Sequence, residues 1–329
     1  MRALVTAEFT PEGLARLEGL GYAVTTAGWG WTGEPLDGDG LAAAVDGSQL
    51  LVCEVEAVDA AVLASSGLRV VASARGTPSN VDLDAATASG VPVLHAPGRN
   101  AGSVADFVVG LLLVQARGIA RGQTHLRQRG WHVDGQVPYL HFRGRELADL
   151  VVGLVGYGAV GRAVARRLRG GFGTRVLACD PPRPPEPGGD AEAADLDALL
   201  AASDVVSLHV PDTPATRGLI GAEAFARMRS GALLINTARG RVVDEAALVD
   251  ALRGGVIAGA ALDVFATEPL PRDHPLLGLD NVTLTPHLAG AADDVVAHHT
   301  RMICDDLERL AAGARPAHLA NPAVWPPRS

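Results

Sequence analysis

Three polar residues in the second half of the chain have the types and positions that proton and hydride chemistry needs. Arg239, Glu268 and His287 each come shortly after a predicted β-strand. The carboxyl ends of the strands line the ligand crevice of an open parallel sheet, so we expect these side chains to project toward one site. An arginine fork can bind a carboxylate, a histidine can exchange a hydroxyl proton, and a neighbouring carboxylate can stabilise the protonated histidine. Hydride transfer at C2 of a 2-hydroxy acid requires these groups.

A glycine-rich turn precedes these residues and has the context of a dinucleotide-binding motif. The strand 151–155 leads into G-Y-G-A-V-G at 156–161, which opens a helix, and the next strand ends on Asp180, nineteen residues after the last glycine. The first glycine permits a tight turn, the second lets the backbone approach a pyrophosphate, and the third lets helix and strand pack closely. The predicted cofactor contacts in this motif are Gly156, Tyr157, Gly158, Ala159, Val160, Gly161 and Asp180.

Asp180 predicts which dinucleotide binds. A carboxylate there accepts hydrogen bonds from the adenosine ribose hydroxyls and repels a 2′-phosphate, which favours NAD over NADP. Arg183, three residues later, could reach a phosphate, but a solvated loop arginine is the simpler interpretation.

These residues need two α/β domains to position them. Short apolar runs alternate with helical patterns, and the pattern indicates parallel pairing and doubly wound sheets in both halves. Two helices and an irregular aromatic segment separate the halves, and a long amphipathic helix follows the second. The predicted strands are 4–6, 22–26, 49–53, 68–72, 91–94, then 151–155, 175–179, 205–209, 232–236, 258–263 and 282–285; the separating helices are 100–117 and 119–129, the aromatic segment is 131–142, and the last helix is 291–312.

Composition excludes several classes of protein. The 329 residues carry a net charge of −9, which gives no basic footprint for nucleic acid. All 28 cationic side chains are arginine, so no side chain can form a Schiff base or act as an amine base. No apolar run reaches the roughly 20 residues of a membrane span, and an early glutamate argues against a secretory signal, so we expect a cytoplasmic protein without membrane contact.

No metal site is expected. Cys53, Cys179 and Cys304 are scattered without metal-ligand spacing, and buried thiols are the simpler reading. His298 and His299 are adjacent on a predicted helix, where neighbouring side chains point about 100° apart and cannot readily share one ion.

The chain resembles the D-isomer-specific 2-hydroxyacid dehydrogenase family, whose members include phosphoglycerate, glyoxylate/hydroxypyruvate and D-lactate dehydrogenases. The resemblance covers almost the whole chain. The segments that carry it are the 156–161 glycine motif, L-H-V-P at 208–211, I-N-T-A-R-G at 235–240, A-L-D-V-F at 261–265 followed by E-P at 268–269, T-P-H at 285–287, N-V-D at 80–82 and P-G-R-N at 97–100.

The resemblance implies roles for residues and an order of domains. Arg239, Glu268 and His287 would be catalytic, and Asp263 would contact the nicotinamide carboxamide. A Rossmann-type NAD domain (100–286) would be inserted in a flavodoxin-like substrate domain (1–99 and 287–329). Further cofactor contacts would be His209, Val210, Pro211, Thr216, Thr237 and Ala238; substrate contacts would be Arg75, Gly76 and Thr77, with Arg239 and His287.

Pro78 departs from the glycine-rich substrate loop expected after Arg75 and removes a backbone donor there. Arg75 and Arg99, in addition to Arg239, suggest a small acid with a second polar or anionic group, such as a phosphate or phosphonate; surface or inter-domain arginines are the simpler alternative. A homodimer is expected from the resemblance, from the helix at 104–117 and from the extended 131–142 segment.

Two other readings stay open. A NAD-sensing corepressor-like binding protein would share the fold but would need a surface or extension that recognises a partner. An L-type lactate or malate dehydrogenase also uses histidine and arginine, but its glycine motif lies near the N-terminus rather than past residue 150.

Overall fold

The computed structural model describes residues 1–65 and 67–326 and divides into two compact units. Unit 1 comprises Met1–Asn100 and Ala292–Ser329, and unit 2 comprises Ala101–Ala291. The second junction follows residue 291 rather than the expected residue 286, so His287 lies in unit 2. The last three residues of the predicted domain 287–329 lie outside the described residues.

Unit 2 contains a seven-stranded sheet in which every pair of neighbouring strands is parallel. The order is β12-β11-β10-β9-β6-β7-β8, so the strand order reverses between β6 and β9, as in the dinucleotide-binding doubly wound fold. Its strands are β6 (Val151–Val155), β7 (Arg175–Cys179), β8 (Glu192–Ala193), β9 (Val205–Leu208), β10 (Leu233–Asn236), β11 (Gly259–Leu262) and β12 (Val282–Leu284).

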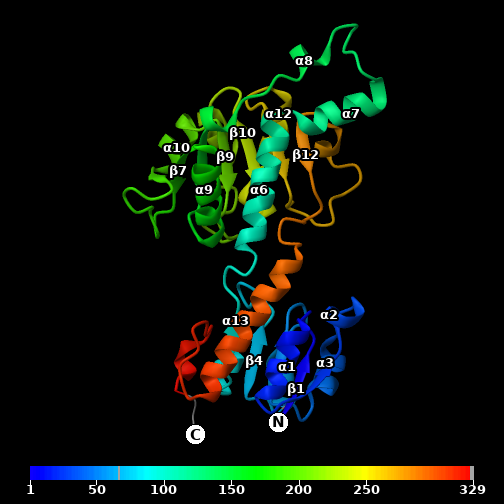
Figure 1. Cartoon of the computed structure of the whole chain (residues 1–329), viewed down its shortest axis with the longest axis vertical. Helices are drawn as coiled ribbons and strands as arrows, with labels where there is room; N and C mark the ends of the chain where they lie inside the picture. Colours follow the sequence, from blue (N-terminus) through cyan, green and yellow to red (C-terminus); the bar gives the residue numbers. More distant parts are fainter. Residues whose placement is uncertain (66, 327–329) are drawn as a thin grey trace. The chain divides into compact units, whose positions relative to one another are not determined.

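Helices cover both faces of this sheet. One apolar core includes residues of α6 and α9, which lie side by side in Figure 1, and the other includes residues of α10, α11 and α12. The helices of unit 2 are α6 (Ala101–Ala116), α7 (Ile119–Arg129), α8 (Pro138–His141), α9 (Ala159–Phe172), α10 (Leu196–Ala202), α11 (Ala222–Arg227) and α12 (Glu245–Arg253), with 3₁₀ turns at Leu147–Asp149, Gly240–Val242 and Pro275–Gly278.

Unit 1 contains a five-stranded parallel sheet in the order β2-β1-β3-β4-β5, which is the flavodoxin-like order. Helices α1 and α13 contribute to the core on one face, and α3, α4 and α5 contribute to the core on the other. The elements are β1 (Arg2–Val5), β2 (Ala23–Thr26), β3 (Leu50–Cys53), β4 (Val70–Ser73), β5 (Val93–His95), α1 (Pro11–Gly19), α2 (Trp29–Thr32), α3 (Gly38–Val45), α4 (Ala60–Ser65), α5 (Leu83–Ala88) and α13 (Asp293–Ala311), with a 3₁₀ turn at Pro322–Val324.

Local sequence explains where many of these helices begin. A side-chain oxygen directly before the helix accepts a hydrogen bond from a backbone N–H of the first turn, which would otherwise lack a partner. The residues that do this are Thr10 for α1, Asp37 for α3, Asp82 for α5, Asp195 for α10 and Asp244 for α12.

The two parallel α/β sheets confirm the predicted fold class. The sequence predicts six strands in the second sheet, and the structure adds a seventh, β8, whose two residues are too few to give an alternating pattern. The short helix α2 is also absent from the prediction. In the part of the chain that the structure describes, no single helix is long and apolar enough to span a membrane; α6 and α7, bent by 57°, pass that test only as a pair, by length and composition.

Candidate active site

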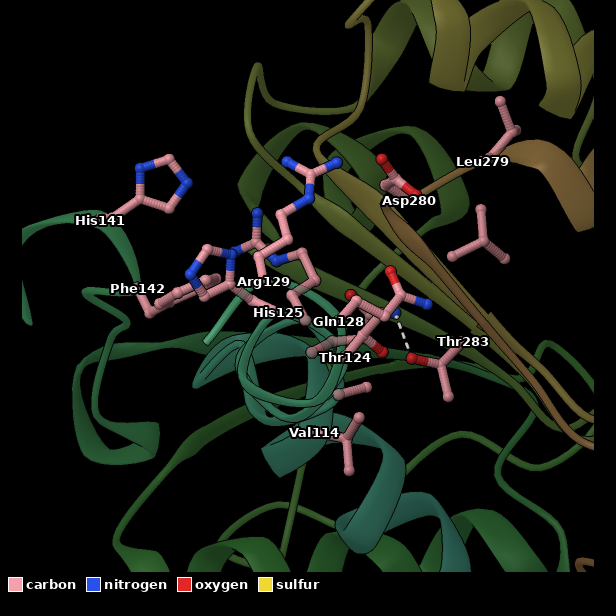
Figure 2. A pocket seen from close by; sticks show the side chains of 14 residues that line it. Val114, Thr124, His125, Gln128, Arg129, His141, Phe142, Leu279, Asp280 and Thr283 are labelled. Carbon is pink, nitrogen blue, oxygen red and sulfur yellow. Dashed lines mark hydrogen bonds between the residues drawn. The ribbon is translucent and has the colours of Figure 1, made fainter. Parts of the chain in front are cut away.

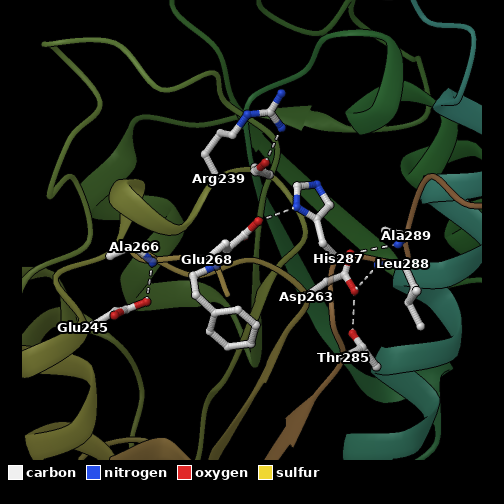
Figure 3. A network of polar contacts seen from close by, with 11 residues as sticks. Arg239, Glu245, Asp263, Ala266, Glu268, Thr285, His287, Leu288 and Ala289 are labelled. Atoms are coloured by element: carbon white, nitrogen blue, oxygen red, sulfur yellow. Dashed lines mark hydrogen bonds and ion pairs between the residues drawn. The ribbon is translucent and has the colours of Figure 1, made fainter. Parts of the chain in front are cut away.

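His287 and Glu268 form an ion pair at the carboxyl end of the unit 2 sheet. Nδ1 of His287, three residues after β12, lies 2.8 Å from Oε2 of Glu268 in the loop after β11 (Figure 3). His287 has a φ of 57°, a left-handed conformation that is uncommon for a residue with a side chain. Such backbone strain is concentrated at functional sites, where the surrounding structure holds it. Because Nδ1 faces the carboxylate, Nε2 is the ring nitrogen left to exchange a proton with another group.

Glu268 is held in its ionised form. Burial alone would raise the pKa of Glu268, but hydrogen bonds from His287 and from the Phe265 N–H, together with the charges of His287 and Arg239, lower that pKa below its ordinary value. The Phe265 N–H donates to Oε1 at 3.0 Å, so each carboxylate oxygen has one partner. A carboxylate fixed in this way orients the imidazole and stabilises its charged form.

Arg239 follows β10 and completes the predicted triplet. Its Nη1 donates to the Ala238 carbonyl at 2.6 Å, and no other hydrogen bond of its guanidinium to a described residue is found. The next residue must be small, because a Cβ on Gly240 would lie 1.9 Å from the Phe265 carbonyl carbon. This close packing brings the loop after β10 against the loop that carries Glu268. The loops enclose a cavity of about 230 Å³, lined by Asp212, Arg239, Gly240, Arg241, Phe265, Ala266, Glu268 and His287.

Asp263 braces the loop that carries His287. Its carboxylate is fully buried and accepts hydrogen bonds from Thr285 Oγ1 at 2.6 Å and from the Leu288 and Ala289 N–H groups at 2.8 Å each (Figure 3). The resemblance implies a contact with nicotinamide for this residue, which stays a prediction; these bonds give it a further role inside the protein. They tie the residues on both sides of His287 to the end of β11.

A second brace could not be recognised from the sequence. Oε1 of Glu245, in α12, accepts a hydrogen bond of 2.7 Å from the Ala266 N–H, and its Oε2 lies 3.5 Å from His274 Nε2. This contact fixes the loop that precedes Glu268. Glu245 stands in the first turn of a helix, where an acidic residue is expected for helix stability alone, so the sequence carries no signal for its loop contact.

The glycine motif has the geometry of a dinucleotide turn. Gly156 has a φ of 101°, and a Cβ there would lie 2.6 Å from the His209 carbonyl oxygen. A Cβ on Gly161 would lie 2.4 Å from the Gly156 carbonyl oxygen, so both positions require glycine. The Tyr157 N–H donates to Oδ2 of Asp180 at 2.7 Å, which leaves Oδ1 without a described partner. Gly158 has open space in front of it at the start of α9.

The other predicted cofactor contacts lie in the loops after β9 and β10. The His209 ring lies 3.0 Å from Ser207 Oγ, and burial lowers the pKa of His209 to about 4, so it is neutral and a poor acid catalyst at neutral pH. Thr216 Oγ1 donates to the Pro211 carbonyl and so closes the segment 211–216, which follows Val210. Ala238 N donates to Asn236 Oδ1.

The residues of this region fit a bound dinucleotide. Thr237 Oγ1 is buried and has no hydrogen-bond partner among the described residues, which is rare for a buried hydroxyl unless another molecule supplies the partner. The N-terminus of α9, a helix of 14 residues, opens at Gly158 and favours an anionic pyrophosphate. The free oxygen of Asp180 suits a ribose hydroxyl.

The predicted substrate loop lies in unit 1 after β4. The Gly76 carbonyl accepts a hydrogen bond from His95 Nδ1 at 2.9 Å, and the Arg75 carbonyl accepts one from the Ala96 N–H. The N–H groups of Gly76 and Thr77 have no partner among the described residues, which is the condition for holding a carboxylate there.

The structure corrects the expectation for Arg99. Its guanidinium is paired with Glu54 through Nη2 and lies 2.8 Å from His299 Nδ1 through Nη1. The Nε2 of His299 lies 2.8 Å from the Glu8 carbonyl and must donate to it, so Nδ1 accepts from Arg99 and this buried imidazole is neutral. Arg99 is therefore not a free cation for a substrate phosphate.

Another cavity contains none of the predicted site residues. It has a volume of about 380 Å³ and lies between α7, the segment after it and the chain that enters β12 (Figure 2). Asp280 and Thr283 line it at the amino end of β12, whereas His287 follows the carboxyl end of that strand. In the described part of the chain, no group of three or more histidine, cysteine or acidic residues could hold a metal ion.

Comparison with known proteins agrees with this geometry. Residues 109–289 match the family model described as "D-isomer specific 2-hydroxyacid dehydrogenase, NAD binding domain". The chain belongs to this family. It is 40% identical over 270 residues to a glyoxylate reductase of Korarchaeum cryptofilum, covering 81% of this chain and 80% of that protein. These matches give no support to the corepressor alternative.

Two further matches bear on fold and length. The chain is 44% identical over 265 residues to D-3-phosphoglycerate dehydrogenase of Mycobacterium tuberculosis, covering 79% of this chain but 48% of that protein. It therefore spans about half the length of the phosphoglycerate dehydrogenases that it matches. A solved structure of a putative D-isomer specific 2-hydroxyacid dehydrogenase from Polaromonas has 29% identity and a TM-score of 0.83, with 97% of this chain and 98% of that one covered.

Proposed function

We propose that this protein is a dehydrogenase that uses NAD to interconvert a small D-2-hydroxy acid and the corresponding 2-oxo acid. The contact that carries the proposal is the 2.8 Å pair between His287 Nδ1 and Glu268 Oε2, in one cavity with Arg239 at the carboxyl ends of β10, β11 and β12. Family membership and the fit of the glycine motif to a dinucleotide support it. Nicotinamide, when bound, would donate or accept the hydride.

The three side chains have distinct roles in this reaction. During reduction, negative charge grows on the C2 oxygen of the 2-oxo acid, and protonated His287 supplies a proton to that oxygen from Nε2. Glu268 keeps the imidazolium oriented and stabilises its charge throughout. The guanidinium of Arg239 binds the substrate carboxylate and the neighbouring oxygen, which fixes the position of C2. In the oxidative direction, neutral His287 removes the hydroxyl proton through the same nitrogen.

A screen of 2-oxo acids with NADH, read at the nicotinamide absorbance, tests the proposal. We expect saturable oxidation of NADH with at least one acid and none with the corresponding aldehyde, which lacks the carboxylate. Glu18→Gln is a suitable control, because this exposed side chain in α1 lies outside the proposed machinery. Oxidation of NADH with aldehydes but with no 2-oxo acid would contradict the proposal.

Cofactor preference follows from the Asp180 carboxylate. Its Oδ1 is open and its negative charge would repel a 2′-phosphate, so NAD is preferred over NADP. Arg183 is exposed, and its backbone N–H donates to the Asp180 carbonyl at 2.9 Å. No metal is needed, since Arg239 and His287 polarise the substrate. In unit 1, Arg75, Gly76 and Thr77 remain the proposed contacts of the substrate carboxylate.

We also propose a homodimer in the cytoplasm. The segment from α7 to α8 projects from the rest of unit 2 in Figure 1 and exposes Ile119, Leu126, Trp131, Val137, Tyr139 and Leu140. Exposed apolar clusters of this kind mark surfaces that other proteins cover. Light scattering that gives twice the 33.8 kDa chain mass at micromolar concentration would support the dimer, and the mass of one chain would refute it.

A further inference from the structure

Three of the four exposed large apolar side chains in the described part of unit 1 lie past the carboxyl ends of its strands. Among its described residues, the large apolar side chains that are exposed are Met1, Trp29, Trp31 and Val55. Met1 precedes β1 at the amino edge. The others lie past the carboxyl ends of β2 and β3 and are each about 40% exposed: 41% for Trp29 and Trp31, and 40% for Val55. Isolated exposed apolar residues are ordinary, but a group at the edge where such sheets bind ligands is informative.

Hydrogen bonds and close packing fix the backbone of the segment that carries both tryptophans. Buried Glu56 accepts a hydrogen bond from the Trp29 N–H at 2.9 Å and another from Thr6 Oγ1 at 2.8 Å. A Cβ on Gly30 would lie 2.0 Å from the Glu8 N atom, so only glycine lets α2 pack against the chain after β1. These contacts hold the backbone of α2 while both indole side chains stay accessible.

The chain after β3, which carries Glu56, connects α2 with the proposed substrate loop. The Glu56 carbonyl accepts a hydrogen bond from Asn80 Nδ2 at 3.1 Å, and Asn80 Oδ1 accepts one from Ser73 Oγ at 2.9 Å. Arg75 Nη1 contacts the Glu54 carbonyl at 3.5 Å. The chain after β3 is therefore bonded to α2 on one side and to the loop after β4 on the other.

The strand order of the sheet sets the distance between α2, which follows β2, and the proposed substrate loop, which follows β4. β2 and β4 are separated by β1 and β3, and neighbouring strands lie about 4.8 Å apart, so the chain after β2 lies about 14 Å from the loop after β4. Val55, after β3, lies between them. A substrate whose carboxylate binds at Gly76 and Thr77 could reach Val55 and the indoles only with a side chain of several heavy atoms.

Charge at this edge argues against a phosphate on that side chain. Within four residues of the carboxyl ends of the five strands, the carboxylates are those of Glu8, Glu54 and Glu56, and the guanidinium groups are those of Arg75 and Arg99, so acids outnumber cations by three to two. Arg99 is already paired with Glu54. Of the nearby imidazoles, His95 contacts the Gly76 carbonyl, and burial lowers the pKa of His299, which is neutral.

We propose that Trp29, Trp31 and Val55 form an apolar subsite for the substrate side chain, so that the preferred 2-oxo acid carries an extended aliphatic or aromatic group. This assignment rests on the proposed dehydrogenase function and narrows its substrate class. Apolar contact with two indoles and a valine strengthens with each methylene or ring that leaves water.

The first test compares specificity constants with NADH. Phenylpyruvate and 4-methyl-2-oxopentanoate should exceed glyoxylate and 3-phosphohydroxypyruvate. The double variant Trp29→Ala/Trp31→Ala should lower kcat/KM for the two apolar acids by about 10- to 100-fold, the range that small apolar groups give in hydrophobic pockets. The same double variant should leave kcat/KM for glyoxylate within about twofold of the wild-type value. Trp29→Phe/Trp31→Phe should retain most of the preference, and Phe172→Ala, which removes an exposed aromatic ring in unit 2, should retain all of it.

The subsite would be overturned if 3-phosphohydroxypyruvate or glyoxylate had a higher specificity constant than the two apolar acids. An equal loss of kcat/KM for every acid in the alanine variant would overturn it as well. Calorimetric titration of the NADH complex with 3-phenyllactate separates this from the proposed function, because that pair cannot react. Turnover without Trp-dependent binding refutes the subsite alone. Trp-dependent binding without turnover of any 2-oxo acid supports the subsite and refutes the dehydrogenase, and neither binding nor turnover refutes both.

Discussion

Replacing Asp263 with Asn tests whether the brace behind His287 sustains catalysis. The amide keeps the shape of the carboxylate but turns one acceptor oxygen into a donor. The less costly orientation keeps the bonds from Thr285 and Leu288 at Oδ1 and sets the new NH₂ against the buried Ala289 N–H. A hydrogen bond to a charged group contributes about 1.5–3 kcal/mol, and an unpaired buried donor costs about 1–3 kcal/mol. The lost hydrogen bond and the unpaired donor partly count the same effect, so the free energy of unfolding should fall by about 2–4 kcal/mol.

For a unit of this size, that loss should lower Tm by roughly 5–15 °C. Turnover should fall by about 10- to 100-fold, because a shift of about 1 Å in a catalytic group has effects of this order. NADH affinity should stay within about twofold if Asp263 acts only through the loop. Differential scanning calorimetry, steady-state kinetics and a titration of NADH fluorescence measure the three quantities. A large loss of NADH affinity would instead support the nicotinamide contact.

The matched control is Asp280→Asn, the same change at an exposed carboxylate without a hydrogen-bond partner among the described residues. It should leave Tm and turnover unchanged. Thr285→Val removes one donor to Asp263 and should have a smaller effect on Tm than Asp263→Asn. A folded Asp263→Asn enzyme with Tm within 2 °C and turnover within about twofold of the wild type would refute the brace.

Three further predictions concern charge and cofactor. Glu268→Gln should move the alkaline limb of the reduction profile to lower pH, because the imidazolium of His287 loses an adjacent negative charge; since the pKa of Glu268 is low, the wild-type carboxylate stays ionised over the same range. An unchanged limb would contradict this. Asp180→Ala should raise kcat/KM with NADPH relative to NADH, and a wild type that already prefers NADPH would shift the weight to Arg183. Prolonged dialysis against a strong chelator should leave turnover unchanged, and activity restored by a divalent ion would show that a metal takes part.

The sequence predicts the site where chemistry and strand position coincide. Arg239, Glu268 and His287 stand after strands that are recognisable as apolar runs, so the topology of a parallel sheet brings them to one edge. The sequence does not distinguish a carboxylate that faces a ligand from one that holds a loop in place. Asp263 follows β11 in either case, and its part in holding the loop is visible only in its bonds to Leu288 and Ala289.

Contacts between distant residues explain the other differences. The sequence predicts a free cation at Arg99 because its partner, Glu54, lies 45 residues earlier and the pairing cannot be recognised from the sequence. The helix α2 has one glycine among its four residues, is flanked by Gly28 and Gly33 and shows no helical periodicity; it forms against Glu56 and the chain after β1. Such elements depend on tertiary contacts rather than on local propensity.

Single-turnover reduction by the His287→Gln variant tests the central claim most directly. Enzyme loaded with NADH is mixed with a saturating 2-oxo acid, and loss of nicotinamide absorbance gives the rate of hydride transfer. The account predicts a rate about 10²–10⁴ times lower than wild type, the usual contribution of a positioned acid–base group, with unchanged NADH affinity and Tm. A folded variant that binds NADH and transfers hydride within a few-fold of the wild-type rate would contradict the assignment of proton transfer to His287.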